Sequence, residues 1–105
     1  VVNAGERVTF QAVGYWCSGG IKDDGSASCG GPEGIRVPND VEAASSPLPG
    51  ALIGTLVGRV GEWVFTIGGG AQVTAQADGE LRLLMNDGVN YADNSGTVEV
   101  RLTFP

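Results

Sequence analysis

The sequence has no histidine, and this absence removes the usual general base and several kinds of metal site. Ser-His-Asp and Cys-His catalytic arrangements both require a histidine, and so do zinc sites of the HExxH type. No GxGxxG or GxxxxGK[ST] phosphate-binding loop occurs either, and Gly68–Gly70 has neither the lysine nor the following helix of such a loop. These absences favour a protein that binds a ligand over an enzyme.

Basic residues are scarce, with 6 Lys and Arg against 12 Asp and Glu, and the net charge is −6. A negative surface repels phosphate backbones and anionic headgroups, so neither nucleic acid nor a membrane is an expected partner. No stretch approaches the roughly 18 apolar residues that a membrane span needs. An acidic balance also has an ordinary meaning, because many soluble proteins carry it for solubility.

Cysteine is limited to two residues, Cys17 and Cys29, with eleven residues between them. We expect a disulfide that closes this loop, which the chain-entropy model values at about 3 kcal/mol. A disulfide indicates an oxidising compartment, so the expected location is secreted, extracellular or periplasmic. Two buried free thiols in a cytosolic protein are the alternative.

Glycine is abundant, at 18 of 105 residues, and it separates short runs whose apolar side chains alternate with polar ones. This two-residue period is typical of half-buried antiparallel strands. No capped helical pattern is present. We therefore predict one all-β domain over residues 1–105, a small antiparallel β-sandwich of the jelly-roll type. The predicted strands are Arg7–Val13, Ala51–Val57, Trp63–Ile67, Gln72–Ala77, Leu81–Met85 and Thr97–Phe104.

Two long segments, 14–49 and 86–96, do not show a strand pattern, and long loops in compact β domains usually carry function. The second segment holds two carboxylates and three carboxamides, from Asp87, Asp93, Asn86, Asn90 and Asn94. Calcium prefers six to eight such oxygens, together with backbone carbonyls. An ordinary Asn/Asp/Gly-rich turn has the same composition. The two aspartates could also serve a glycosidase, although so small a sandwich leaves little room for a cleft.

Four blocks of the chain form a collinear set: Gly5–Tyr15, Gly31–Gly34, Gly50–Ile53 and the segment from Asn86 to Gly96. They resemble, in the same order, blocks of the bacterial galactophilic lectins of the LecA type. Asn86-Asp87, Tyr91 and Asn94-Ser95-Gly96 are similar to the calcium-loop signature of that family. Three further blocks look like its first strand, its Gly-Pro-Gln-Gly turn and its Gly-Ala-Leu strand: Gly5–Tyr15, Gly31–Gly34 and Gly50–Ile53. The resemblance implies a small jelly-roll sandwich that binds a galactoside, whose hydroxyls complete the coordination of one calcium ion.

By position, the resemblance implies a calcium site built from Ser18, Asp87, Asn90, Asp93 and Asn94, with Ser18 and Asn90 supplying backbone carbonyls. It also implies that Asp87 and Asp93 contact the sugar hydroxyls. The expected sugar-binding set further includes Gly88, Val89, Asn90 and Val37, and Trp16, whose ring could stack on a sugar face. The family's histidine and glutamine that hold the sugar have no counterpart in this chain, where the region reads Val37-Pro38-Asn39-Asp40, and the turn between Asp87 and Tyr91 is one residue shorter. Trp16 could instead pack against the disulfide, beside Cys17.

The expected function is therefore calcium-dependent binding of a galactoside or another glycan. The protein would be a free lectin, such as a homo-oligomer, or a module appended to a larger protein. The alternative is a structural or adhesion module whose calcium ion only holds loops together.

Overall fold

A computed structural model describes residues 1–21, 27–35, 46–87 and 95–104, and for 18–21, 27–28 and 95 it describes the backbone alone. The described residues form seven strands and no helix, so they include no helix that could cross a membrane. The all-β expectation is thus confirmed. The strands are β1 (Arg7–Ile21), β2 (Ala27–Gly30), β3 (Leu56–Val60), β4 (Trp63–Thr66), β5 (Gly70–Thr74), β6 (Leu81–Met85) and β7 (Ser95–Thr103).

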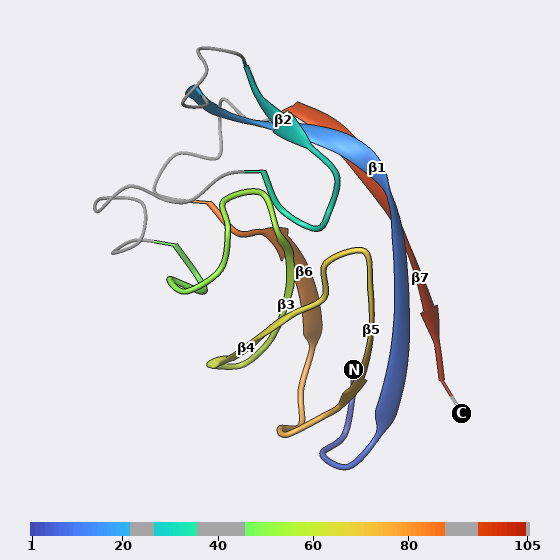
Figure 1. The fold of residues 1–105 in the computed structure, drawn as a ribbon. Helices are drawn as coiled ribbons and strands as arrows, with labels where there is room; N and C mark the ends of the chain where they lie inside the picture. Colours follow the sequence, from blue (N-terminus) through green and yellow to red (C-terminus); the bar gives the residue numbers. More distant parts are fainter. Residues whose placement is uncertain (22–26, 36–45, 88–94, 105) are drawn as a thin grey trace.

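The strands build two antiparallel sheets that face each other (Figure 1). In the four-stranded sheet the long strand β1 is central. β7 pairs along one of its edges, whereas β5 pairs with the first part of the other edge and β2 with the last part. The second sheet has the order β4-β3-β6. Every pairing between the seven described strands is antiparallel, as predicted for a β-sandwich.

The core lies between the sheets and follows from the alternation of apolar side chains. On β1, Val8, Phe10 and Ala12 are buried, and they meet Leu56 and Val60 of β3. Apolar side chains along β7 pack against this core but stay partly exposed: Val98, Val100 and Leu102. The difference in burial is expected, because β1 is a central strand of its sheet and β7 is paired on one side.

Two strand predictions were wrong in their position. β3 begins at Leu56 rather than Ala51, because the residues before it form turns, with the Thr55 N–H donating to the Leu52 carbonyl. Gly54 has a φ of 90°, which an extended strand does not adopt. The next prediction, Gln72–Ala77, is shifted: β5 runs from Gly70 to Thr74.

The expectation that segment 14–49 contains no strand was also wrong, since β1 continues to Ile21 and pairs with β2. In the sequence, Gly14 looks like the end of the predicted strand Arg7–Val13. In the structure, it allows β1 and β7 to approach each other closely. A Cβ at this position would lie 2.7 Å from the Cα of Val98. Gly14 thus keeps β1 and β7 together rather than ending β1, and β7 begins at Ser95, inside the second predicted loop.

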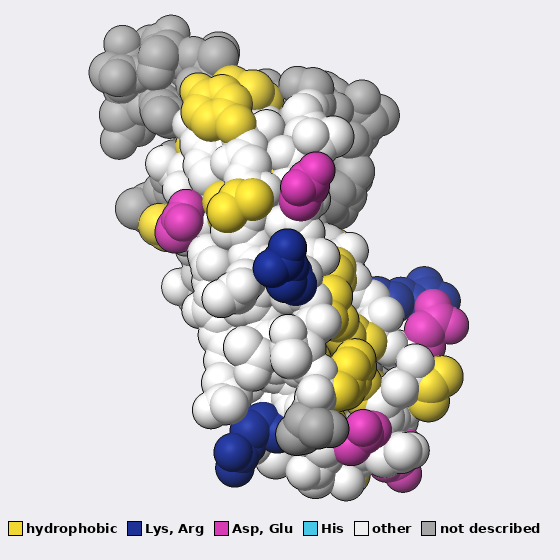
Figure 2. All heavy atoms as spheres, turned by 90° about the vertical axis from the view of Figure 1, so that its right-hand side faces the viewer, with side chains coloured by type: hydrophobic (Ala, Val, Ile, Leu, Met, Phe, Trp, Pro, Cys, Tyr) yellow, Lys and Arg dark blue, Asp and Glu magenta, His cyan; other side chains and the backbone are white. Residues whose placement is uncertain are grey.

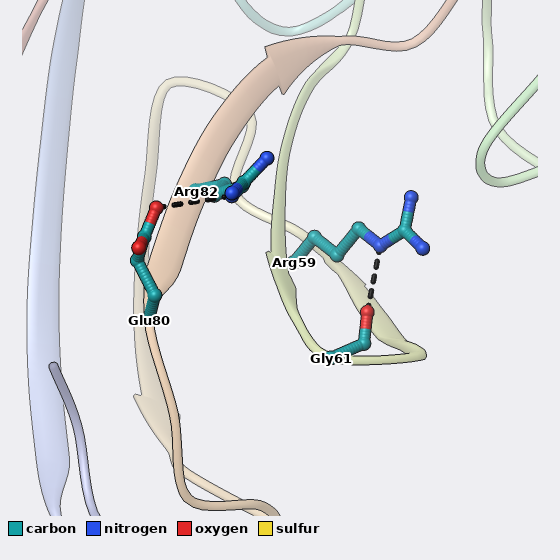
Figure 3. A network of polar contacts seen from close by, with 4 residues as sticks. All are labelled: Arg59, Gly61, Glu80 and Arg82. Carbon is teal, nitrogen blue, oxygen red and sulfur yellow. Dashed lines mark hydrogen bonds and ion pairs between the residues drawn. The ribbon is translucent and has the colours of Figure 1, made fainter.

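Two arginines lie directly opposite each other on the outer surface of the three-stranded sheet. Arg59 of β3 is in register with Arg82 of β6, and the two line an open hollow of about 310 Å³ with Gly61 and Leu84. Figure 3 shows that Arg82 reaches Glu80, with 3.0 Å between nitrogen and oxygen, while the Arg59 Nε donates to the Gly61 carbonyl at 2.7 Å. Like charges in register across a sheet destabilise it.

Replacing Arg59 with threonine is therefore expected to raise the free energy of unfolding by about 0.2–1 kcal/mol at low salt, because the repulsion is removed and threonine suits a strand. The gain should shrink at high salt, which screens exposed charges. Urea unfolding at two salt concentrations measures it. Arg7→Thr is the matched control, because Arg7 faces Thr74 and the change in net charge is the same. Equal effects of the two substitutions would contradict the repulsion.

Candidate functional site

One end of the sandwich brings together both ends of the loop that the sequence predicts to bind calcium. Asn86 and Asp87 follow directly after β6 in one sheet, and Ser95 begins β7 in the other. Cys17 of β1 is in register with Ser95, so the backbone of Ser18 lies next to the point where the loop enters β7. The fold thus places Asp87, Ser18 and the two ends of the loop at the same end of the molecule (Figure 1).

Asn86 is fully buried and holds this end of the sandwich in shape. Its side-chain oxygen accepts a hydrogen bond from the Leu48 N–H at 2.9 Å. Its side-chain nitrogen lies within hydrogen-bond distance of the carbonyls of Leu48, Ala51 and Leu52, at 3.0, 3.2 and 3.2 Å. Both polar atoms of the amide are therefore committed to the segment 48–52. From the sequence, the side-chain oxygen of Asn86 was expected to be available to a cation. In the structure, Asn86 is instead a positioning residue.

The backbone of Asn86 also joins β6 to the segment before β3. Its N–H donates to the Thr55 carbonyl and its carbonyl accepts from the Gly54 N–H, each at 2.8 Å. The Gly54 carbonyl in turn accepts from the indole N–H of Trp16, at 2.8 Å. Trp16 thus connects β1 to the segment that supports Asn86, and its half-buried ring packs against the core. The structure gives Trp16 a packing role, and its contact with a sugar stays a prediction.

The carboxyl group of Asp87 belongs to a residue that is only 6% exposed. Carboxylate oxygens are among the ligands that calcium prefers. Asp87 comes directly after the rigidly held Asn86, so its backbone position is well defined. A hard oxygen ligand in a fixed, sheltered position fits the calcium site that the sequence predicts.

Of the other predicted site residues, Ser18 and Trp16 belong to the described part of the chain. Ser18 is described by its backbone, which is the part expected to bind the ion. The remaining predicted site residues lie outside the described part of the chain: Gly88, Val89, Asn90, Asp93, Asn94 and Val37. Within the described residues, no three His, Cys, Asp or Glu side chains gather as a metal site. Of the predicted carboxylates, only Asp87 can therefore be placed.

An open hollow of about 520 Å³ adjoins the segment that Asn86 holds. This volume lies within the range of about 300–1,000 Å³ that is typical of ligand pockets. Leu52 is 41% exposed and contributes an apolar surface to the hollow, while Glu33 contributes a carboxylate. The residues that line it are Glu33, Leu48, Gly50, Ala51, Leu52, Thr55 and Thr66. This hollow could not be predicted from the sequence, because its walls come from three separate segments.

The predicted disulfide is confirmed. Cys17 of β1 and Cys29 of β2 face each other in register, with 4.0 Å between their Cα atoms. The bond joins the two strands directly before Ser18, and therefore supports the strand end from which a backbone ligand is expected. No free cysteine is present, so a reducing agent would act on this bond alone.

Reduction of the disulfide is expected to lower the free energy of unfolding by about 2–4 kcal/mol, because the unfolded chain gains freedom. Calcium affinity should fall as well, since the strand end at Ser18 loses its crosslink. Urea unfolding with and without dithiothreitol measures the first effect, and the double variant Cys17→Ser/Cys29→Ser should match the reduced protein. An unchanged urea midpoint after complete reduction would show that the bond adds nothing to stability.

Comparison with known proteins finds a similar fold among the solved structures. No family model matches the chain, and no curated protein matches it. A solved structure described as "EclA N-terminal domain; PllA-like lectin" matches with a TM-score of 0.71 and 24% sequence identity, over 99% of this chain and 81% of that one. The chain therefore has the β-sandwich fold of that lectin domain.

Proposed function

We propose that this protein binds a carbohydrate through a calcium ion held at the end of the sandwich where β6 ends and β7 begins. The observation that carries the proposal is that the buried Asp87, the backbone of Ser18 and both ends of the oxygen-rich loop lie at this same end of the sandwich. The matching solved structure is a lectin domain by its description, and this supports the same kind of ligand here.

The oxygen ligands of the ion would come from five residues of the chain. Asp87 and Asp93 would supply carboxylate oxygens, Asn94 a side-chain oxygen, and Ser18 and Asn90 backbone carbonyls. Together these make a hard, oxygen-only site of the kind that calcium prefers. When bound, the ion supplies a positive charge that neutral sugar hydroxyls can coordinate in place of water. The carboxylates beside it would accept the hydroxyl protons in charge-assisted hydrogen bonds.

The sugar would lie against the same loop, in contact with Asp87, Gly88, Val89, Asn90 and Asp93. A vicinal diol suits such a site because its two oxygens can replace two waters on one ion. A galactoside is the ligand we propose, by its likeness to the LecA-type lectins. The arrangement serves binding rather than catalysis, and the disulfide agrees with a location outside the cytosol.

The test is a calcium titration by calorimetry, followed by a glycan array with and without a chelator. The proposal predicts one calcium ion per chain and a glycan signal that disappears with the chelator. Calcium binding without any glycan signal would instead indicate an ion that only holds loops together. A glycan signal that survives both the chelator and Asp87→Asn would mean that the sugar binds elsewhere.

A further inference from the structure

The sandwich has one side that is closed by the chain and one side that is open. β4 and β5 belong to different sheets but are joined by only three residues, Ile67–Gly69, so they flank the same side. β6 and β7 are the edge strands on the opposite side of the two sheets. Within the described residues, β7 pairs with β1 alone, which leaves its outer edge without a strand.

Apolar side chains are exposed along this open side. Leu83 of β6 is 37% exposed and Phe104, after β7, is 47% exposed. Val100 and Leu102 of β7 are only partly buried although they face the core. Figure 2 shows hydrophobic side chains gathered in a stripe alongside the polar outer surface. A long edge strand beside exposed apolar surface is a site where another chain can pair.

The charges on β7 indicate which chain would pair there. Glu99 and Arg101 lie on its outer face, opposite Val13 and Gln11 of β1, and both are exposed. Neither side chain forms a hydrogen bond or ion pair with another described residue. The strand therefore presents one negative and one positive side chain, two residues apart, on the same face. When two such strands run antiparallel, the glutamate of each copy can face the arginine of the other.

An antiparallel pair of β7 strands can use this complementarity in one register. If a two-fold axis passes at Val100, Glu99 of each copy faces Arg101 of the other, and Val98 faces Leu102 on the inner side. An axis at Glu99 would place two carboxylates opposite each other, and an axis at Arg101 would place two guanidinium groups opposite each other. Cross-strand pairs of opposite charge stabilise a sheet and like pairs destabilise it, so the sequence of β7 selects the register at Val100.

We propose that two copies of this protein form a symmetric dimer through antiparallel pairing of their β7 strands, centred on Val100. The four-stranded sheets would join into one continuous sheet, and the apolar stripe would be covered on both copies. The interface is isologous, as in most closed dimers. An open hollow of about 540 Å³ lies beside the charged side chains, over β1 and β7, and is lined by Gln11, Val13, Glu99, Val100 and Arg101. This inference is independent of the proposed ligand.

The test is sedimentation velocity over a wide concentration range, on the wild type and on variants that change the charges of β7. The wild type is expected to form a species of twice the 10.7 kDa chain mass. Glu99→Arg should weaken dimerisation by about 10- to 30-fold, because two cross-strand pairs change from attraction to repulsion. The charge-swapped double variant Glu99→Arg/Arg101→Glu should recover the dimer, since it restores both pairs in the same register.

Glu62→Arg is the matched control: it makes the same charge change in the exposed β3–β4 turn and should leave dimerisation unchanged. Circular dichroism confirms that each variant folds, and Arg101→Glu replaces Glu99→Arg if the latter does not. The proposal is overturned by a wild type that stays monomeric at every concentration, by a Glu99→Arg variant that dimerises as tightly as the wild type, or by a charge swap that fails to restore the dimer.

Discussion

Asn86→Ala is expected to lower the free energy of unfolding by about 3–5 kcal/mol, the largest effect of any single substitution outside the hydrophobic core. The side chain is fully buried, and its removal leaves the Leu48 N–H and three backbone carbonyls without their partner. Buried polar groups that lose a hydrogen bond keep the full cost of their desolvation. The segment 48–52 should loosen with it, because Asn86 is what holds that segment to β6.

Urea unfolding by circular dichroism measures this effect. Asn3→Ala is the matched control, since Asn3 is exposed and the same amide is removed, and its expected change is within about 0.5 kcal/mol. A loss below about 1 kcal/mol for Asn86→Ala would contradict the structural role, because it would mean that water or a shifted backbone satisfies all four groups.

Asp87→Asn is expected to weaken calcium binding by about 100-fold or more, because a hard divalent cation depends on carboxylate charge and the amide supplies none. The substitution keeps the size and one oxygen of the side chain, so it tests the charge of the side chain and not its shape. Calcium at about 100 times its Kd should stabilise the wild type by about 2.7 kcal/mol, and this gain should vanish in the variant.

Calorimetry gives the affinity, and thermal unfolding with and without calcium gives the gain in stability. Asp78→Asn is the control: it makes the same change in charge, but Asp78 lies before the start of β6, at the opposite end of that strand from Asp87. The two variants should differ sharply in calcium affinity. An Asp87→Asn protein that binds calcium as tightly as Asp78→Asn would remove Asp87 from the site.

A dimer through β7 would matter for binding, since it would carry two copies of the proposed sugar site on one particle. Two linked sites gain avidity on a surface that displays many copies of the same glycan, without any new contact at either site. The charge-reversed monomer provides the comparison, because its single-site affinity should be unchanged.

The parts of the fold that the sequence predicted are those in which local pattern and tertiary contact agree. β6 was predicted with its observed bounds, Leu81–Met85, because a turn precedes it and polar residues follow it. The disulfide was predicted because only two cysteines are present and no other chemistry uses them. In both cases the decisive information lies within a few neighbouring residues.

The parts that were wrong depend on contacts between distant segments. Gly14 lies inside β1 because β7 approaches its backbone, and nothing near Gly14 in the sequence shows that. β3 was placed too early because Ala51–Val57 is apolar, while the turn at Gly54 is set by its hydrogen bonds to Asn86 and Trp16. Asn86 was misjudged for the same reason, since the segment it holds lies 34 to 38 residues away.

The most direct measurement is a crystal structure of the protein grown with abundant calcium. We predict one ion at the end of the sandwich, with an Asp87 carboxylate oxygen and the Ser18 carbonyl oxygen both within about 2.3–2.6 Å of it. Well-ordered density that shows water alone beside Asp87, or an ion bound somewhere else on the chain, would contradict the account.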